Sequence, residues 1–187
     1  MIGDEDLADM VDRTRRLRQG FAGTAPRAWD PATAGAELAV QLGHVALCVA
    51  RHRGMDVSAY EDVARPIGDL GDELADVTLA ALSISVLADV PPAHIELART
   101  AASGSEIEAL LLLLVCAGQA VEAGLVAAGY RHQPTGTPVL LPQASAATVT
   151  AAAQFAGLLG LDLPAEFRAM NADASDFLTS YRDGDAR

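Results

Sequence analysis

The apolar residues of this chain recur every three to four positions over long stretches, and this spacing constrains the fold more than any other feature. It places apolar side chains on one face of an α-helix, whereas the alternation typical of a half-buried strand is not sustained over any strand-length window. Alanine is abundant and aromatic residues make up only 4% of the chain, which favours helices that pack closely through small side chains. The sequence therefore predicts an all-α protein.

Helix boundaries follow from proline, glycine and capping residues. Asp30 followed by Pro31 is typical of a helix N-terminus, and Gly54 and Gly129 are typical of positions just beyond a helix C-terminus. With the proline pair at 91–92 as a further break, these signals predict helices over residues 4–18, 31–53, 67–88, 91–102, 105–128, 144–160 and 163–181.

The second half of the chain repeats the plan of the first. A shift of 75 residues places Gly54 on Gly129, and a shift of 72 aligns 73–95 with 145–167. We infer an internal duplication, in which two related helical hairpins form a four-helix bundle, either as a monomer with a pseudo-dimeric core or as a homodimer. The expected divisions are an N-terminal helix with its linker, a first repeat and a second repeat: 1–30, 31–103 and 104–187.

The charge balance excludes several partners. Thirteen basic residues, all of them arginines, face 25 acidic ones, for a formal charge of −12. This surface repels phosphate backbones, so we expect no nucleic-acid partner. The longest apolar run, 109–118, is shorter than a membrane-spanning helix requires, so we expect no membrane partner. An acidic N-terminus without an apolar signal region, and two cysteines without metal-type spacing, indicate a cytoplasmic protein.

Acidic residues gather on one face of the helix predicted over 67–88. Asp69, Glu73 and Asp76 are spaced i, i+4, i+7 and share a face. Crowded carboxylates repel one another, and a divalent cation is the usual compensation. Asp69 and Asp72 equally suit a helix start, where acidic residues interact favourably with the dipole. In an antiparallel hairpin this face would meet residues of the preceding helix with the same progression: Glu37, Gln41, His44 and Cys48.

Residues 29–54 followed by 68–82 resemble the MazG-like all-α nucleoside triphosphate pyrophosphohydrolases. Members of that family typically carry a Trp before the first long helix, then an ExxE motif and, further along the chain, an ExxD motif. Here Trp29 precedes the helix, and 28 residues separate His44 from Glu73. The resemblance covers 29–95 directly and the second half only through the repeat.

This resemblance implies a MazG-like four-helix fold and a small nucleotide ligand. In an intact family site, carboxylates hold divalent metal, Mg²⁺ or Mn²⁺, and water attacks the α-phosphorus to release a nucleoside monophosphate and pyrophosphate. It assigns catalytic roles in this chain to Glu73, Asp76 and His44. Metal ligation is assigned to residues in or beside the motifs: Glu73, Asp76, His44, Gln41, Asp69 and Glu37.

The chain departs from the family pattern at the first motif. Glu73 and Asp76 match ExxD, but Gln41 and His44 stand at the ExxE positions. Losing two acids weakens Mg²⁺ binding, and a His ligand shifts the preference toward Mn²⁺ or Zn²⁺. His44 equally suits a core histidine bonded to a carboxylate. The second half is interpreted as a degenerate copy that keeps only Glu122, with neutral residues at the motif positions: Cys116, Gln119, Ser145 and Thr148.

Phosphate contacts would require positive charge near the site. Arg51, Arg53 and Arg131 follow the ends of the two long helices, where they would either contact a ligand or interact with the helix dipoles. Trp29, the single Trp, would either stack on a base or pack against the bundle. The arginines of the first helix are expected to form a solvated face, paired with nearby Asp residues: Arg13, Arg15, Arg16 and Arg18.

The sequence thus supports two hypotheses about function. The first is a divergent metal-dependent nucleoside triphosphate pyrophosphohydrolase with a single site. The second is a catalytically inactive MazG-like module that binds a nucleotide or another protein.

Overall fold

The computed structural model describes residues 2–62, 64, 66–93, 104–133, 135–182 and 184. This part of the chain contains six helices and no strand, so the prediction of an all-α helical bundle is confirmed. Most of the helix predicted over 91–102 lies outside the described residues. The helices are α1 (Asp4–Phe21), α2 (Pro31–His52), α3 (Leu70–Leu87), α4 (Glu106–Ala127), α5 (Leu141–Leu158) and α6 (Leu163–Arg182).

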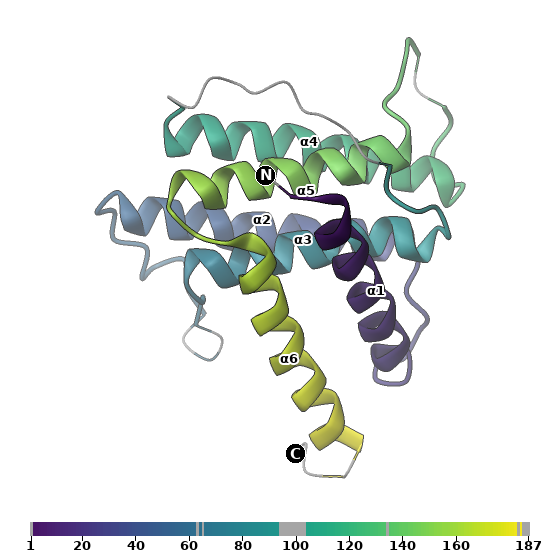
Figure 1. The fold of residues 1–187 in the computed structure, drawn as a ribbon, viewed down its shortest axis with the longest axis horizontal. Coiled ribbons are helices and arrows are strands. Elements are labelled where there is room, and N and C mark those ends of the chain that lie inside the picture. The colour runs from purple at the N-terminus through teal and green to yellow at the C-terminus, as the bar shows by residue number, and fades with distance from the viewer. Residues whose placement is uncertain are drawn as a thin grey trace.

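Four helices run side by side as two hairpins, while α1 and α6 cross them at a steep angle (Figure 1). α2 packs against α3 and α4, and α5 packs against α4 and α3, so the four form a closed bundle. α1 and α6 pack against each other and against α3. α2 and α4, the two long outer helices, are antiparallel. At one end of the pair His52 Nδ1 lies 2.9 Å from Glu106 Oε1, and at the other end Tyr130 donates a hydrogen bond to Asp30 at 2.9 Å.

The predicted capping signals shape the helix ends. Asp30 accepts a hydrogen bond from the backbone N–H of Thr33 at the start of α2, with Pro31 in the first turn. Ser105 forms a capping box with Glu108 at the start of α4. Gly54 and Gly129 have φ values of 79° and 75°, the left-handed conformation that ends a helix and that glycine adopts without strain.

Several boundaries differ from the predicted ones. α1 continues to Phe21 because its apolar face extends through the last turn and packs on the core. α3 starts at Leu70 rather than at 67, since the Asp69 side chain caps it. α5 starts at Leu141 rather than at 144, because Pro142 in the first turn has no N–H to lose there.

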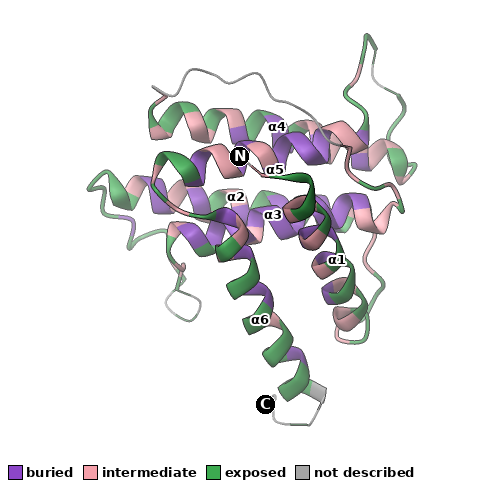
Figure 2. Ribbon diagram, in the orientation of Figure 1, coloured by how far each residue is buried: buried purple, intermediate pink, exposed green. Residues whose placement is uncertain are grey.

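The inner pair of helices, α3 and α5, is buried along almost its whole length, whereas α2 and α4 each keep one face in solvent (Figure 2). Glycines bring the two hairpins close together: a Cβ on Gly35 of α2 would lie 3.2 Å from Val121 of α4, and one on Gly124 of α4 would lie 2.5 Å from Ile84 of α3. The bundle therefore packs through small residues at the contact of its two hairpins, as the alanine-rich composition predicts.

Two of the described helices are long and apolar enough to span a membrane: Pro31–His52, with mean hydropathy 1.3, and Glu106–Ala127, with mean hydropathy 2.1. α5 with Leu163–Tyr181 passes the same criterion as a pair bent by 108°. This finding rests on length and composition alone. The length of the longest apolar run therefore does not exclude a membrane-spanning helix, and the absence of a membrane partner stays a prediction.

Candidate functional site

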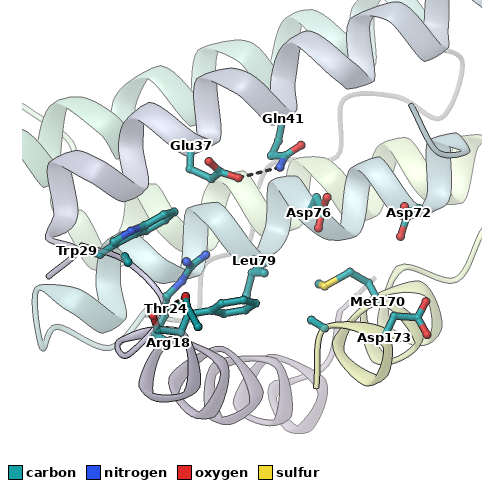
Figure 3. Close-up of a pocket in the computed structure, with 13 residues that line it drawn as sticks. Arg18, Thr24, Trp29, Glu37, Gln41, Asp72, Asp76, Leu79, Met170 and Asp173 are labelled. Atoms are coloured by element: carbon teal, nitrogen blue, oxygen red, sulfur yellow. Dashed lines mark hydrogen bonds between the residues drawn. The ribbon is translucent and has the colours of Figure 1, made fainter. Parts of the chain in front are cut away.

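A pocket of about 520 Å³ opens where α1, α2, α3 and α6 meet (Figure 3). One wall is apolar and aromatic, and the other is rich in carboxyl groups. The lining residues are Arg18, Phe21, Thr24, Ala25, Trp29, Glu37, Gln41, Asp72, Asp76, Leu79, Met170, Asp173 and Ala174.

Helical spacing explains how the polar wall forms. Glu37 and Gln41 are one turn apart on α2, and Asp72 and Asp76 are one turn apart on α3, so each pair projects from one face of its helix. The hairpin brings these two faces together. Of the predicted metal ligands, the structure thus places Glu37, Gln41 and Asp76 on the pocket.

Arg18 provides the positive charge of the pocket. Its Nε donates to Ser83 Oγ at 2.6 Å, and its guanidinium carbon lies 4.5 Å from the centre of the Trp29 ring, a cation–π arrangement. Burial lowers the pKa of Arg18, while the charges of Glu37 and Asp76 raise it. The prediction of a solvated Arg18 is therefore wrong. It holds for Arg13 and Arg15, which pair with acidic residues on α1 itself.

Gln41 has an unused acceptor at the pocket. Its Nε2 donates to Glu37 Oε1 at 3.0 Å, but its Oε1 is buried and has no hydrogen-bond partner. Only 9% of the Gln41 residue is exposed, so bulk water does not readily satisfy this atom. A buried acceptor without a partner costs free energy, and a ligand N–H or O–H in the pocket would offset that cost.

The pKa of Asp76 is raised to about 7, mainly because the carboxyl group is buried. Negative charge on Asp72, Glu73 and Glu37 raises the pKa further, and Arg18 acts in the opposite direction. Asp76 therefore titrates near neutral pH, so that it can either donate or accept a proton there.

The two remaining motif residues bond to each other. His44 Nδ1 lies 3.1 Å from Glu73 Oε2, while Glu73 Oε1 accepts the backbone N–H of Gly68 at 2.8 Å. Glu73 is only 4% exposed, and neither residue lines the pocket. The four motif positions thus divide into a pair on the pocket, Gln41 and Asp76, and a pair that is closed on itself.

These residues do not fit the four-carboxylate metal site that the resemblance implies. Both oxygens of Glu73 already accept hydrogen bonds or face His44, and Asp69 Oδ1 caps α3 by accepting from the N–H groups of Gly71 and Asp72 at 2.8 and 3.0 Å. Within the described ranges, no group of three or more His, Cys, Asp or Glu side chains is arranged to hold a metal ion. The capping role that the sequence left open for Asp69 is confirmed.

The predicted phosphate contacts lie elsewhere. Arg51 pairs with Glu61 and lines a second pocket, of about 460 Å³, together with Asp69. Arg53 is an exposed residue at the C-cap of α2. Arg131 lies 2.7 Å from Glu122. Of the four predicted substrate contacts, the structure places only Trp29 on the pocket with Gln41 and Asp76.

The corresponding positions on α5 are neutral and hydrogen-bonded, one to α3 and one within α5 itself. Ser145, aligned with Glu73, accepts a 2.6 Å hydrogen bond from Ser85. Thr148, aligned with Asp76, donates to the carbonyl of Ala144 at 2.9 Å. Cys116 is buried, which raises the pKa of its thiol, and burial raises the pKa of the Cys48 thiol to about 11. Neither cysteine therefore has the properties of a nucleophile.

Sequence reasoning missed the residues that α1 and α6 bring to the pocket: Phe21, Met170 and Asp173, with Arg18 assigned to solvent. For Arg18 a signal was present, since it directly follows Leu17 on the apolar stripe of α1. For Met170 and Asp173 no local pattern distinguishes a pocket position from an ordinary helix face.

A comparison of the chain with protein-family models, with curated proteins and with solved structures finds no match. The chemistry of the pocket is therefore interpreted from its own side chains.

Proposed function

We propose that this protein is a MazG-like binding module that holds a small molecule in the pocket between α1, α2, α3 and α6 without hydrolysing it. The observation that carries the proposal is the pairing of His44 with Glu73. This contact occupies two of the four positions at which an active family member would hold metal. A binding role needs only the pocket, whereas hydrolysis needs those positions free.

The side chains on the pocket define the chemistry of the ligand. Trp29, Phe21 and Met170 offer flat and polarizable apolar surface, suited to a ring. The polar groups are mainly acceptors: Gln41 Oε1 and the carboxyl groups of Glu37, Asp72, Asp76 and Asp173. Of the described lining residues only Arg18 is positively charged, and it already contacts Ser83 and Trp29.

A ligand with a flat ring, N–H donors and a neutral or positive charge matches these groups. A nucleobase with an exocyclic amino group meets these requirements, in keeping with the nucleotide ligand expected from the sequence. A bare triphosphate does not, because four carboxyl groups on the pocket repel it.

Calorimetric titration with nucleosides tests the proposal. Cytidine and adenosine, whose bases carry an amino group, should bind more tightly than uridine, which lacks one. Gln41→Met removes the unpartnered acceptor at similar volume and should weaken cytidine binding about tenfold. Gln119→Met, on the corresponding helix of the second hairpin, should leave it unchanged. Equal binding of the three nucleosides, or none, would contradict the ligand assignment.

The second candidate is the metal-dependent nucleoside triphosphate pyrophosphohydrolase. One observation favours it: the hairpin does bring the two motifs together, and Glu37, Asp72 and Asp76 line one cavity. The assay is pyrophosphate release from the common nucleoside triphosphates with Mg²⁺ or Mn²⁺. We expect no release above background. Release that Glu73→Gln abolishes would overturn the binding-module proposal in favour of the enzyme.

A further inference from the structure

An apolar face covers the outer side of the α2–α4 pair, opposite the inner helices. Its large side chains are well exposed: Leu111 is 55% and Val115 59% exposed on α4, and Val40 is 49% exposed on α2. Ile107 and Leu114, at 41% and 40%, complete it. Single exposed apolar residues are normal on a protein surface, but a contiguous group of this kind marks an interaction site.

Helical spacing makes these residues one surface, which we call the outer face. Positions 107, 111, 114, 115 and 118 form one stripe over the first three turns of α4. Positions 40, 43 and 47 form a stripe on α2. The contact of His52 with Glu106 places the last turns of α2 beside the first turns of α4, so the two stripes lie next to each other.

The outer face contains no charged residue although the chain carries a formal charge of −12. On α4 the nearest acids are Glu108, which lies in the first turn beside Ile107, and Glu122, which follows the stripe and pairs with Arg131. Gly43 and Gly118 lie within the stripes, and a Cβ at either would meet nothing within 4 Å, so another helix could approach closely. An uncharged surface lets two copies of the same net charge meet without bringing like charges into direct contact.

The charge argues for a second copy rather than a lipid surface. Helices that lie on membranes carry Lys and Arg on their polar flanks, which attract anionic lipids. Here lysine is absent and the residues that flank the α4 stripe are glutamates. Three turns of two adjacent helices offer roughly 500 Å² per copy, or about 1,000 Å² for a symmetric pair, which reaches the lower limit of a specific interface.

We propose that the outer face docks onto the same face of a second copy, so that the protein is a symmetric dimer held together by α2 and α4. The proposal is independent of the pocket, which opens among α1, α2, α3 and α6 on another side of α2. It selects the homodimer from the two oligomeric states that the sequence leaves open.

Light scattering coupled to gel filtration tests the dimer. The wild-type protein should have a mass about twice 19.3 kDa. Leu111→Glu places an unpaired carboxylate in the interface and should raise the dimer dissociation constant by roughly 100-fold or more. Val40→Glu makes the same test from α2. Leu158→Glu, at an exposed residue at the end of α5, is the matched control and should leave the dimer intact.

Circular dichroism checks that each variant keeps its helices. If one of the two interface variants, Leu111→Glu or Val40→Glu, fails to fold, the other still tests the dimer. Added salt should strengthen the dimer, because it screens repulsion between two chains of charge −12. A wild-type mass of 19.3 kDa at millimolar concentration would overturn the proposal. Equal dimerisation of the Leu111→Glu and Leu158→Glu variants would do so too. Co-sedimentation of a monomeric wild type with phosphatidylcholine vesicles would assign the face to a membrane instead.

Discussion

The two hairpins of the bundle are built from helices of the same lengths, since α2 and α4 are each 22 residues long and α3 and α5 are each 18. Their interiors differ. The α2–α3 hairpin holds a half-buried acid of raised pKa, Asp76, and the partly buried contact of His44 with Glu73. At the aligned positions the α4–α5 hairpin holds hydroxyl groups: Ser145 accepts a hydrogen bond from Ser85 of α3, and Thr148 donates to its own helix.

The surroundings account for where the charged groups are tolerated. α1 and α6 pack mainly on α3 and add Arg18 and a cavity to the first hairpin, so its carboxyl groups face a cation and a solvent-accessible space. Neither of the two pockets described above is lined by residues of α4 or α5. Buried hydroxyls cost less free energy to satisfy than buried carboxylates, which explains how a hairpin with helices of the same length folds without charges at these positions.

The largest effect should come from the contact between the hairpins. Gly124→Val inserts side-chain atoms where a Cβ alone would lie 2.5 Å from Ile84, and should lower the free energy of unfolding by about 3 kcal/mol. Gly157→Val is the control, because a Cβ there meets nothing within 4 Å. Urea unfolding measures both. Equal stabilities would show that the two hairpins do not depend on this close approach.

The next effect is a difference between the hairpins in how the free energy of unfolding depends on pH. The folded pKa of Asp76, about 7, exceeds its unfolded value near 4, so the folded state binds the proton more tightly. The stability from this proton is complete below about pH 4 and is lost as the pH rises through 7. Asp76→Asn should therefore be more stable than the wild type by about 2 kcal/mol at pH 8, with little difference at pH 4.

Thr148→Val makes the matching change in the second hairpin, where no ionisable group is altered. Its effect on the free energy of unfolding should be the same at pH 4 and pH 8. Urea titrations of both variants at the two pH values provide the measurement. A pH-independent effect of Asp76→Asn would contradict the assignment of the raised pKa to this carboxyl group.

The smallest effect concerns the hydrogen bonds made by two aligned residues, Glu73 and Ser145. Double-mutant cycles with alanine should give a coupling free energy of about 1 kcal/mol for both His44–Glu73 and Ser85–Ser145. Only the first pair contains a carboxylate, so only its coupling should weaken in molar salt. Two couplings with the same salt response would remove the electrostatic distinction between these two contacts.

Local sequence signals were sufficient for the fold. Helix ends are set by local contacts that involve only neighbouring residues, and the sequence therefore predicts them. The residues are Asp30, Pro31, Gly54, Ser105 and Gly129. Boundaries failed where a distant element decides them. Phe21, for example, extends α1 because it packs on the core and stacks on Phe177 of α6. The residues next to Phe21 in the sequence do not predict this long-range contact.

The sequence predicted some of the residues on the pocket but not their hydrogen-bond partners. Helical spacing placed Glu37 with Gln41, and the hairpin brought them to Asp76. The same spacing grouped Asp76 with Asp69 and Glu73, whereas the structure places it on the pocket with Asp72. Which oxygen bonds to which donor depends on the register between α2 and α3. That register turned His44 toward Glu73 and left Gln41 on the pocket, and no spacing rule specifies it. The contribution of α6 depends on its crossing of α3, which is again a long-range property.

Trp29 is the single Trp of the chain, and its indole lies against Arg18 at the rim of the pocket. The protein therefore contains its own optical label at the place where α1, α2 and the cavity join. Its emission will respond when the guanidinium leaves the ring, whether an incoming molecule displaces it or α1 detaches from the bundle. Undocking of the first helix can thus be followed in real time on the unmodified chain.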